Sequence, residues 1–181
     1  MIAMPKTKMH VDEYYELPET MKPIHLIDGV LIEMPSPKFS HQQVLIQLVN
    51  WFSSQLQRIG GVVSMAPTDV HLDAKNIPQP DLLWIAQDRM NIIVDDKVMG
   101  APDFIAEVLS LSTRKFDRTT KFRLYEKFGV RELWFVDPEA RLIEVWTLID
   151  GKFQYLDGYG FDETFQSPLF GTVDATTIFF V

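Results

Sequence analysis

The chain has 181 residues, a length that suits one domain with its own hydrophobic core, and we expect a single domain over residues 1–181. No run approaches the ~18 apolar residues of a membrane span, and the absence of cysteine excludes disulfides and thiolate metal sites. The formal net charge of −8 argues against a surface that is positive throughout, which duplex nucleic acid would favour. No apolar segment follows Lys6 and Lys8, so we expect no signal peptide and a cytoplasmic protein.

The first half of the chain predicts a short helix, a hairpin, a long helix and three short strands. Asp28-Gly29 between two apolar runs is a strong hairpin signal. Ser40, with Gln43 three residues later, has the spacing of a capping box at the start of the long helix, and Gly60-Gly61 ends it. The expected elements lie at residues 11–17, 25–34, 40–59, 62–65, 69–72 and 81–85.

The second half predicts a buried strand, a second helix and further strands. Residues 104–109 are apolar except for Glu107, as in a central strand that is covered on both faces. The helix over 117–128 is expected to end at Gly129, and strands follow at 132–136 and 142–148, with small antiparallel strands from 152 onward. This order indicates an α/β fold with a mixed sheet and a helix on each face.

Three acidic residues stand in unusual places. Glu107 interrupts the apolar strand, Asp81 begins a strand directly after Pro80, and Glu33 lies between Ile32 and Met34 at the end of the hairpin. A buried carboxylate is costly unless a cation or several hydrogen bonds satisfy it, and two adjacent carboxylates repel each other. A divalent metal ion between Asp81 and Glu107 would remove both costs.

Lys121 adds a cation to this set. It lies on the helix that follows Glu107, with Asp117 one turn before it and Tyr125 one turn after it. A helix packed on the sheet can direct the Lys121 ammonium group toward the carboxylates. A lysine in that place would either stabilise negative charge in a phosphorane-like transition state or help to orient a metal-bound water.

Ordered motifs between residues 25 and 138 carry a resemblance to a known family. Together they resemble the PD-(D/E)xK nuclease superfamily, and more narrowly the Uma-type family of restriction-endonuclease-like proteins. The specificity lies in the whole ordered set, because Pro-Asp alone is common. The matching residues are Leu26-Ile27-Asp28-Gly29, Glu33-Met34, Pro37, His41, Pro80-Asp81, Glu107-Val108-Leu109-Ser110, Thr113-Arg114, Asp117-Arg118, Lys121, Tyr125, Gly129-Val130, Glu132-Leu133-Trp134 and Val136-Asp137-Pro138.

The resemblance implies a restriction-endonuclease-like sheet core with two flanking helices. It implies that Asp81 and Glu107, with the backbone carbonyl of Val108, bind Mg²⁺ or Mn²⁺, and that Glu33 is an auxiliary acid. The implied reaction is hydrolysis of a phosphodiester bond in nucleic acid, with DNA as the expected substrate, by in-line attack of water.

One departure from the superfamily pattern leaves a second hypothesis open. The superfamily motif has lysine two positions after the acid, where this chain has Leu109, and in the Uma-type family Lys121 of the next helix fits that role. The alternative is a nuclease-like scaffold that does not cut and serves as a binding module. A Lys121 side chain beside the carboxylates would favour the nuclease, and one that points to solvent would favour the scaffold.

Each candidate residue also has a structural interpretation. In that interpretation Glu107 is a buried acid that pairs with a basic residue such as Arg123, and Lys121 pairs with Asp117 one turn before it. Asp81 would then bond the backbone of its own turn, and Glu33 would face solvent.

Three further residues are candidates for contact with the substrate. Arg114 and Arg118 belong to a basic stretch that is either a solvated helix face or a track for phosphates. His41 near a helix start either contacts a phosphate or packs and caps the helix. The spacing of His10, His25 and His71 does not indicate a zinc site.

A homodimer would provide two sites for the two strands of a duplex, and symmetric dimers are the commonest oligomers. The apolar residues of the C-terminal segment either form such an interface or close the core, and the sequence leaves both open. These residues are Phe161, Phe165, Leu169, Phe170, Ile178, Phe179 and Phe180.

Overall fold

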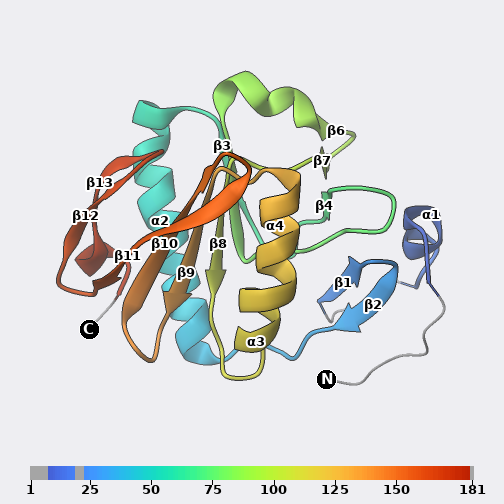
Figure 1. Ribbon diagram of the computed structural model, residues 1–181, viewed down its shortest axis with the longest axis horizontal. Coiled ribbons are helices and arrows are strands. Elements are labelled where there is room, and N and C mark those ends of the chain that lie inside the picture. The colour runs from blue at the N-terminus through green and yellow to red at the C-terminus, as the bar shows by residue number, and fades with distance from the viewer. Residues whose placement is uncertain (1–7, 19–22, 180–181) are drawn as a thin grey trace.

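A six-stranded mixed sheet forms the centre of the computed structural model, which describes residues 8–18 and 23–179 (Figure 1). The strand order is β11-β10-β9-β8-β5-β3, and neighbouring strands are antiparallel except for β8 and β9, which are parallel. The strands are β3 (Val62–Met65), β5 (Leu82–Ile85), β8 (Phe104–Val108), β9 (Glu132–Asp137), β10 (Leu142–Ile149) and β11 (Lys152–Gly160). The expected α/β class with a mixed sheet is therefore confirmed.

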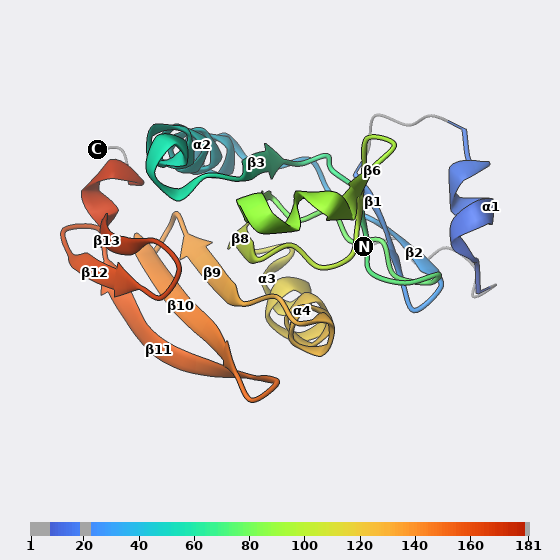
Figure 2. The same cartoon turned by 90° about the horizontal axis from the view of Figure 1, so that it is seen from above.

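Helices cover both faces of this sheet (Figure 2). The long helix α2 (Phe39–Ile59) packs on one face. On the other face lies one continuous helical segment made of α3 (Arg114–Phe116), the π-helical turn η2 (Asp117–Lys121) and α4 (Phe122–Phe128). This segment is the crossover between the parallel strands β8 and β9. It ends at Gly129, whose φ of 85° gives the left-handed cap that the sequence predicts.

The alternation of side chains along β8 decides which residues face which helix. Phe104 and Ala106 belong to the core cluster under α2, whereas Ile105 belongs to the cluster under α4. Successive side chains of a strand point to opposite faces of the sheet. Glu107 therefore shares the α4 face with Ile105, and the same count along β5 places Asp81 on that face with Leu83.

The N-terminal hairpin is formed by β1 (Ile24–Ile27) and β2 (Val30–Glu33). Asp28 and Gly29 have φ values of 50° and 78°, the positive angles of a type I′ turn, which confirms the hairpin prediction. The hairpin and the short helix α1 (Val11–Tyr15) lie beyond α4, at the end of the molecule away from β11 (Figures 1 and 2).

The long helix starts earlier than its capping signal indicated. α2 begins at Phe39 with Lys38 as the N-cap residue, and no side chain caps it, so the prediction that Ser40 is the cap is wrong. The helix expected over residues 117–128 also starts earlier, at Arg114. Both differences lie within the first turn, where packing of the chain against the body competes with local capping preferences.

A small three-stranded sheet was not expected as such. It is formed by β4 (Val70–His71), β6 (Ile93–Val94) and β7 (Lys97–Met99), and a 3₁₀ helix, η1 (Gln87–Ile92), directly precedes β6. The strand predicted at 69–72 is present in shortened form as β4.

The C-terminal segment closes the core. β11 is the edge strand of the main sheet, and the hairpin of β12 (Thr164–Ser167) and β13 (Gly171–Asp174) is followed by the 3₁₀ turn η3 (Ala175–Thr177). Phe165, Phe170, Ile178 and Phe179 are buried in the cluster under α2, and Phe161 and Leu169 pack against it. The four buried residues therefore close the core, whereas Phe161 and Leu169 are partly exposed and the homodimer stays a prediction. Phe180 lies outside the described residues.

A buried acid fastens this segment to the sheet. Glu132 of β9 accepts hydrogen bonds from the Ser167 hydroxyl at 2.7 Å, the Leu169 amide at 2.9 Å and the Trp134 indole at 2.6 Å.

No helix in the described part of the chain is long and apolar enough to cross a membrane.

Candidate metal and catalytic site

The antiparallel register of β5 and β8 brings the two candidate metal ligands together. Leu82 pairs with Ala106, so Asp81, one residue before β5, stands opposite Glu107 at the end of the pair. Both side chains lie on the α4 face by the alternation described above. The Val108 amide donates to Asp81 Oδ2 at 2.8 Å, which ties the carboxylate of Asp81 to the strand that carries Glu107.

Asp81 is held as a carboxylate. Its Oδ2 also accepts a hydrogen bond from His41 Nε2 of α2 at 3.2 Å. Burial acts to raise the pKa of Asp81, but the hydrogen bonds from His41 and Val108 and the positive charge of Lys121 outweigh burial, so the pKa is lowered. Two elements that lie far apart in the sequence thus fix and ionise this side chain.

Glu107 is the least exposed of the three acids Asp81, Glu107 and Asp117. Its side chain is 1% exposed, and its oxygens accept hydrogen bonds from Lys121 Nζ at 2.8 Å and from the Tyr125 hydroxyl at 2.5 Å. Burial, together with the negative charges of Asp81 and Asp117, raises the pKa of Glu107 to about 8 despite the opposing effect of Lys121.

The π-helical turn η2 places Lys121 between two acids. Its ammonium group lies 2.8 Å from Glu107 and 3.4 Å from Asp117, and the side chain is 4% exposed. Burial acts to lower the pKa of Lys121, but the surrounding carboxylates outweigh it and the pKa is raised, so this lysine is protonated. The pKa of Asp117 is raised, chiefly by burial. Such π-turns are frequent at functional sites.

The residues fit a divalent metal ion of the Mg²⁺ type. Three acids, Asp81, Glu107 and Asp117, lie around one lysine, and burial together with the two neighbouring acids raises the pKa of Glu107. Within residues 8–18 and 23–179 no three His, Asp or Glu side chains converge as a complete ligand set. Mg²⁺ does not need one, because it is usually held by one or two carboxylates together with water and substrate phosphate.

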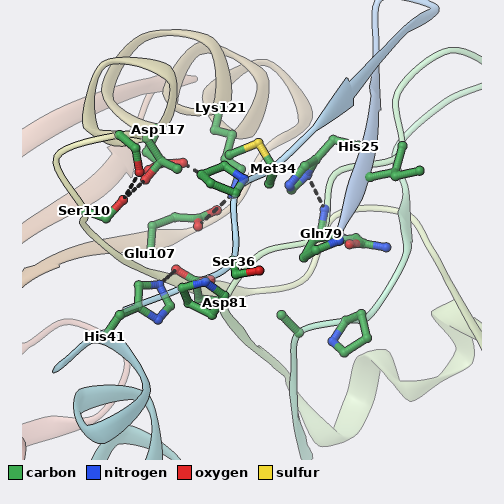
Figure 3. A pocket seen from close by; sticks show the side chains of 18 of the residues that line it. His25, Met34, Ser36, His41, Gln79, Asp81, Glu107, Ser110, Asp117 and Lys121 are labelled. Carbon is green, nitrogen blue, oxygen red and sulfur yellow. Dashed lines mark hydrogen bonds and ion pairs between the residues drawn. The ribbon is translucent and has the colours of Figure 1, made fainter. Parts of the chain in front are cut away.

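A cavity of about 600 Å³ opens onto this cluster (Figure 3). Asp81, Glu107, Asp117, Lys121 and His41 form one part of its wall. The facing part comes from the N-terminal hairpin, α1 and the segment before β5, with His25, Met34 and Gln79 among its residues. The acids therefore line a cavity that is partly open to solvent rather than a flat surface.

Comparisons with known proteins agree with this fold. A model of the Uma2 family, described as "Putative restriction endonuclease", matches residues 11–177. The chain belongs to the Uma2 family. A crystal structure described as "a putative nuclease belonging to DUF820 from Anabaena variabilis ATCC 29413" has a TM-score of 0.78 and 22% identity, covering 94% of this chain and 97% of that chain. At that identity it shows the shared fold. No curated protein matches the sequence.

Membership of the Uma2 family supports a nuclease-like function, and the structure allows each candidate residue of this family member to be placed. Asp81, Glu107, the backbone of Val108, Lys121 and His41 come together in one cluster. The partner of Glu107 is Lys121, whereas Arg123 is exposed. Asp81 bonds the backbone of the neighbouring strand rather than its own turn.

The remaining candidates lie elsewhere. Glu33 ends β2 next to Met34, which lines the cavity, but Glu33 is not among the described residues of the cavity wall. Arg114 pairs with Asp137 at 2.6 Å, and Arg118 forms two hydrogen bonds with Glu144 at 2.7 and 2.6 Å. Neither arginine belongs to the described wall of the cavity.

Sequence reasoning missed His25 and Gln79. His25 is 3% exposed and lines the cavity. Its Nδ1 accepts a hydrogen bond from the backbone N–H of Gln79 at 2.9 Å. A polar residue inside an apolar strand is the signal that singled out Glu107. The same signal is present at His25 in β1, between Ile24 and Leu26.

Proposed function

We propose that this Uma2-family protein is a nuclease that depends on Mg²⁺ or Mn²⁺ and hydrolyses phosphodiester bonds, with DNA as its substrate. One observation carries the proposal: a buried, protonated Lys121 lies 2.8 Å from Glu107, which stands opposite Asp81 on the wall of a cavity. Lysine beside two adjacent carboxylates suits phosphodiester hydrolysis, because it joins a cation site to a fixed positive charge.

The chain's own residues have distinct roles in this proposal. Asp81 and Glu107, with the Val108 carbonyl, would hold the ion, which when bound supplies a Lewis acid that activates water and neutralises developing charge. Lys121 keeps its positive charge at neutral pH and offers it to the phosphate. His41 orients Asp81, as outer hydrogen-bond partners orient metal ligands.

The placement of Lys121 favours the nuclease over the non-catalytic scaffold. A scaffold has no need of a buried cation, and the lysine of a lost site would be expected to turn toward solvent. Lys121 is buried and bound to Glu107 and Asp117 instead. Burying such a cluster carries a desolvation penalty that an apolar core would not have. In addition, ionisable groups with strongly shifted pKa values gather at functional sites.

The test combines metal binding with cleavage. Calorimetry with Mg²⁺ and Mn²⁺ is run on the wild type, on Asp81→Asn and on Lys121→Met, and the same proteins are assayed on labelled DNA. Asp81→Asn should lose both metal binding and cleavage, and Lys121→Met should lose about 10²–10³-fold in rate.

The matched controls are Asp88→Asn in η1 and Lys127→Met in α4, because both side chains are exposed and neither belongs to the described cavity wall. Both control variants should behave as the wild type does. Undiminished cleavage by Asp81→Asn would overturn the proposal.

A further inference from the structure

The wall of the cavity carries too little positive charge for a duplex. The Lys and Arg residues among its described members are Lys38 and Lys121. Lys121 is neutralised by its two acids, and Lys38 pairs with Glu139 at 3.3 Å. The acids of the wall are Asp69, Asp81, Glu107 and Asp117. A metal ion would offset part of this charge, enough for one or two phosphates rather than for a row of them.

The arginines expected to track phosphates are already paired. Arg114 is bound to Asp137, and both terminal nitrogens of Arg118 are bound to Glu144. A duplex presents one negative charge per ~1.7 Å of its axis, and its binding depends on neutralising several of these charges. With the chain at −8 overall, a duplex lying across the site would meet net repulsion.

The size and lining of the cavity suit unpaired nucleosides. About 600 Å³ is within the range of pockets that enclose one small molecule, and is too small for a base-paired helix. Much of the wall away from the acids is apolar, with Leu17, Ile24, Met34 and Pro67 among its residues. Unstacked bases and sugars bury apolar surface on such walls, whereas the bases of a duplex are stacked on one another.

His25 provides a hydrogen-bond donor in the same space. Its Nδ1 accepts a hydrogen bond from the backbone N–H of Gln79 at 2.9 Å (Figure 3), so the ring proton of the neutral imidazole is on Nε2. Burial and the charge of Lys121 hold the pKa of His25 well below its usual value, which keeps the ring neutral. Because His25 belongs to the wall of the cavity, the N–H at Nε2 can donate to an oxygen of the substrate.

We propose that the substrate of this site is single-stranded or unpaired nucleic acid, of which one phosphodiester and its flanking nucleosides enter the cavity, with His25 Nε2 donating to the strand. The inference rests on the proposed nuclease function and narrows its substrate class. The charge and the dimensions of the cavity argue against continuous duplex as the substrate.

The test measures binding and cleavage separately. Fluorescence anisotropy in Ca²⁺, which takes the same oxygen ligands as Mg²⁺, compares a labelled 15-nucleotide single strand with the blunt duplex of the same sequence. Cleavage of both is followed in Mg²⁺ and Mn²⁺. The single strand should bind and react at least tenfold better. Its affinity should fall with salt at a logarithmic slope no steeper than about −1.4, the value for two contacted phosphates.

Variants of His25 test its part. His25→Leu removes the donor and should weaken single-strand binding about tenfold, whereas His25→Gln keeps an N–H donor and should retain most of the affinity. His10→Leu, an exposed position outside the described cavity wall, is the matched control, and thermal unfolding checks that each variant folds. Equal loss in His25→Leu and His25→Gln, with both folded, would remove His25 from the proposal.

The outcomes separate this inference from the function on which it rests. Metal-dependent cleavage that prefers duplex, or a salt slope as steep as many phosphate contacts produce, overturns the single-strand inference and leaves the nuclease intact. No metal binding and no cleavage of either DNA overturns both.

Discussion

Replacing Glu107 with glutamine separates the metal site from a merely structural ion pair. In the metal-free protein the Glu107 carboxylate lies beside Asp81 and near Asp117, with Lys121 as the nearby buried cation. An amide of the same shape removes one negative charge and leaves Lys121 with Asp117 at 3.4 Å. If Glu107 is kept for metal binding, Glu107→Gln should lose the metal and should gain stability at high pH.

The magnitude follows from the pKa of Glu107. It rises from 4.5 to about 8 on folding, so the unfolded chain loses this proton first as the pH increases. The contribution of Glu107 to the free energy of unfolding is therefore fully present below pH 4.5. It falls between pH 4.5 and pH 8 and changes no further above that range. At about 1.4 kcal/mol per pKa unit, the loss has an upper bound of about 5 kcal/mol. Glu107→Gln should not show this loss.

The assay is urea unfolding of both proteins in EDTA between pH 5 and pH 8.5. Groups far from the cluster titrate in both proteins alike, so the difference between the two curves reports Glu107 together with its effect on the neighbouring Asp117. Saturating Mg²⁺ should then stabilise the wild type at pH 8, by about 2.7 kcal/mol at 100 times Kd, and leave the variant unchanged.

The reasoning is refuted if Glu107→Gln is several kcal/mol less stable at pH 8 without metal and still gains the wild-type increment with Mg²⁺. Glu107 would then be the structural partner of Lys121 and not a metal ligand.

Two further substitutions test other parts of the structure. His41→Ala removes the side chain that fixes Asp81 and should weaken Mg²⁺ binding about 10–100-fold in calorimetry with little change in fold; an unchanged Kd would show that Asp81 needs no such support. Phe170→Ala opens a cavity at a fully buried ring that contacts Phe52, Trp84 and others, and should cost about 3–5 kcal/mol in urea unfolding; a cost under 1 kcal/mol would mean that the C-terminal segment does not close the core.

Local signals predicted most of the fold. Asp28-Gly29 specifies its turn because both residues adopt positive φ, and Gly129 ends α4 for the same reason. The strand interrupted by Glu107 was identified because a run with apolar residues on both faces fits only a covered strand. Signals of this kind depend on the residue and its immediate neighbours, which the sequence contains in full.

Long-range pairings were not predictable in the same way. Asp95 and Asp96 form a turn with φ values of 49° and 59°, but Asp-Asp is a weaker turn signal than Asp-Gly, so β6 and β7 were missed. The hydrogen bond from His41 to Asp81 joins residues 40 positions apart. The acids that pair with the two arginines lie on β9 and β10, and no sequence spacing relates them to the crossover helix.

The partner of Glu107 was nevertheless within reach of the helical period. At 3.6 residues per turn, Lys121 and Tyr125 share a face of the helix, whereas Arg123 lies about 200° around from Lys121. The structure shows Lys121 and Tyr125 on Glu107 and Arg123 in solvent. The helical period alone therefore argued against Arg123 as the structural partner of Glu107. The same comparison of helix positions can be made for any helix that packs over a buried acid.

The cluster is difficult to explain by stability alone. Glu107 shares its face of the sheet with Ile105 and with an apolar core, where leucine would pack without desolvating any charge. Replacing buried ion pairs by apolar residues is often neutral or stabilising. Here the fold keeps three acids around one lysine and leaves one of them with a pKa near 8. Burial and the neighbouring carboxylates make it costly to ionise this acid, and a bound cation would lower that cost. A cluster of this kind on the wall of a cavity is the expected cost of a site that must bind a metal ion.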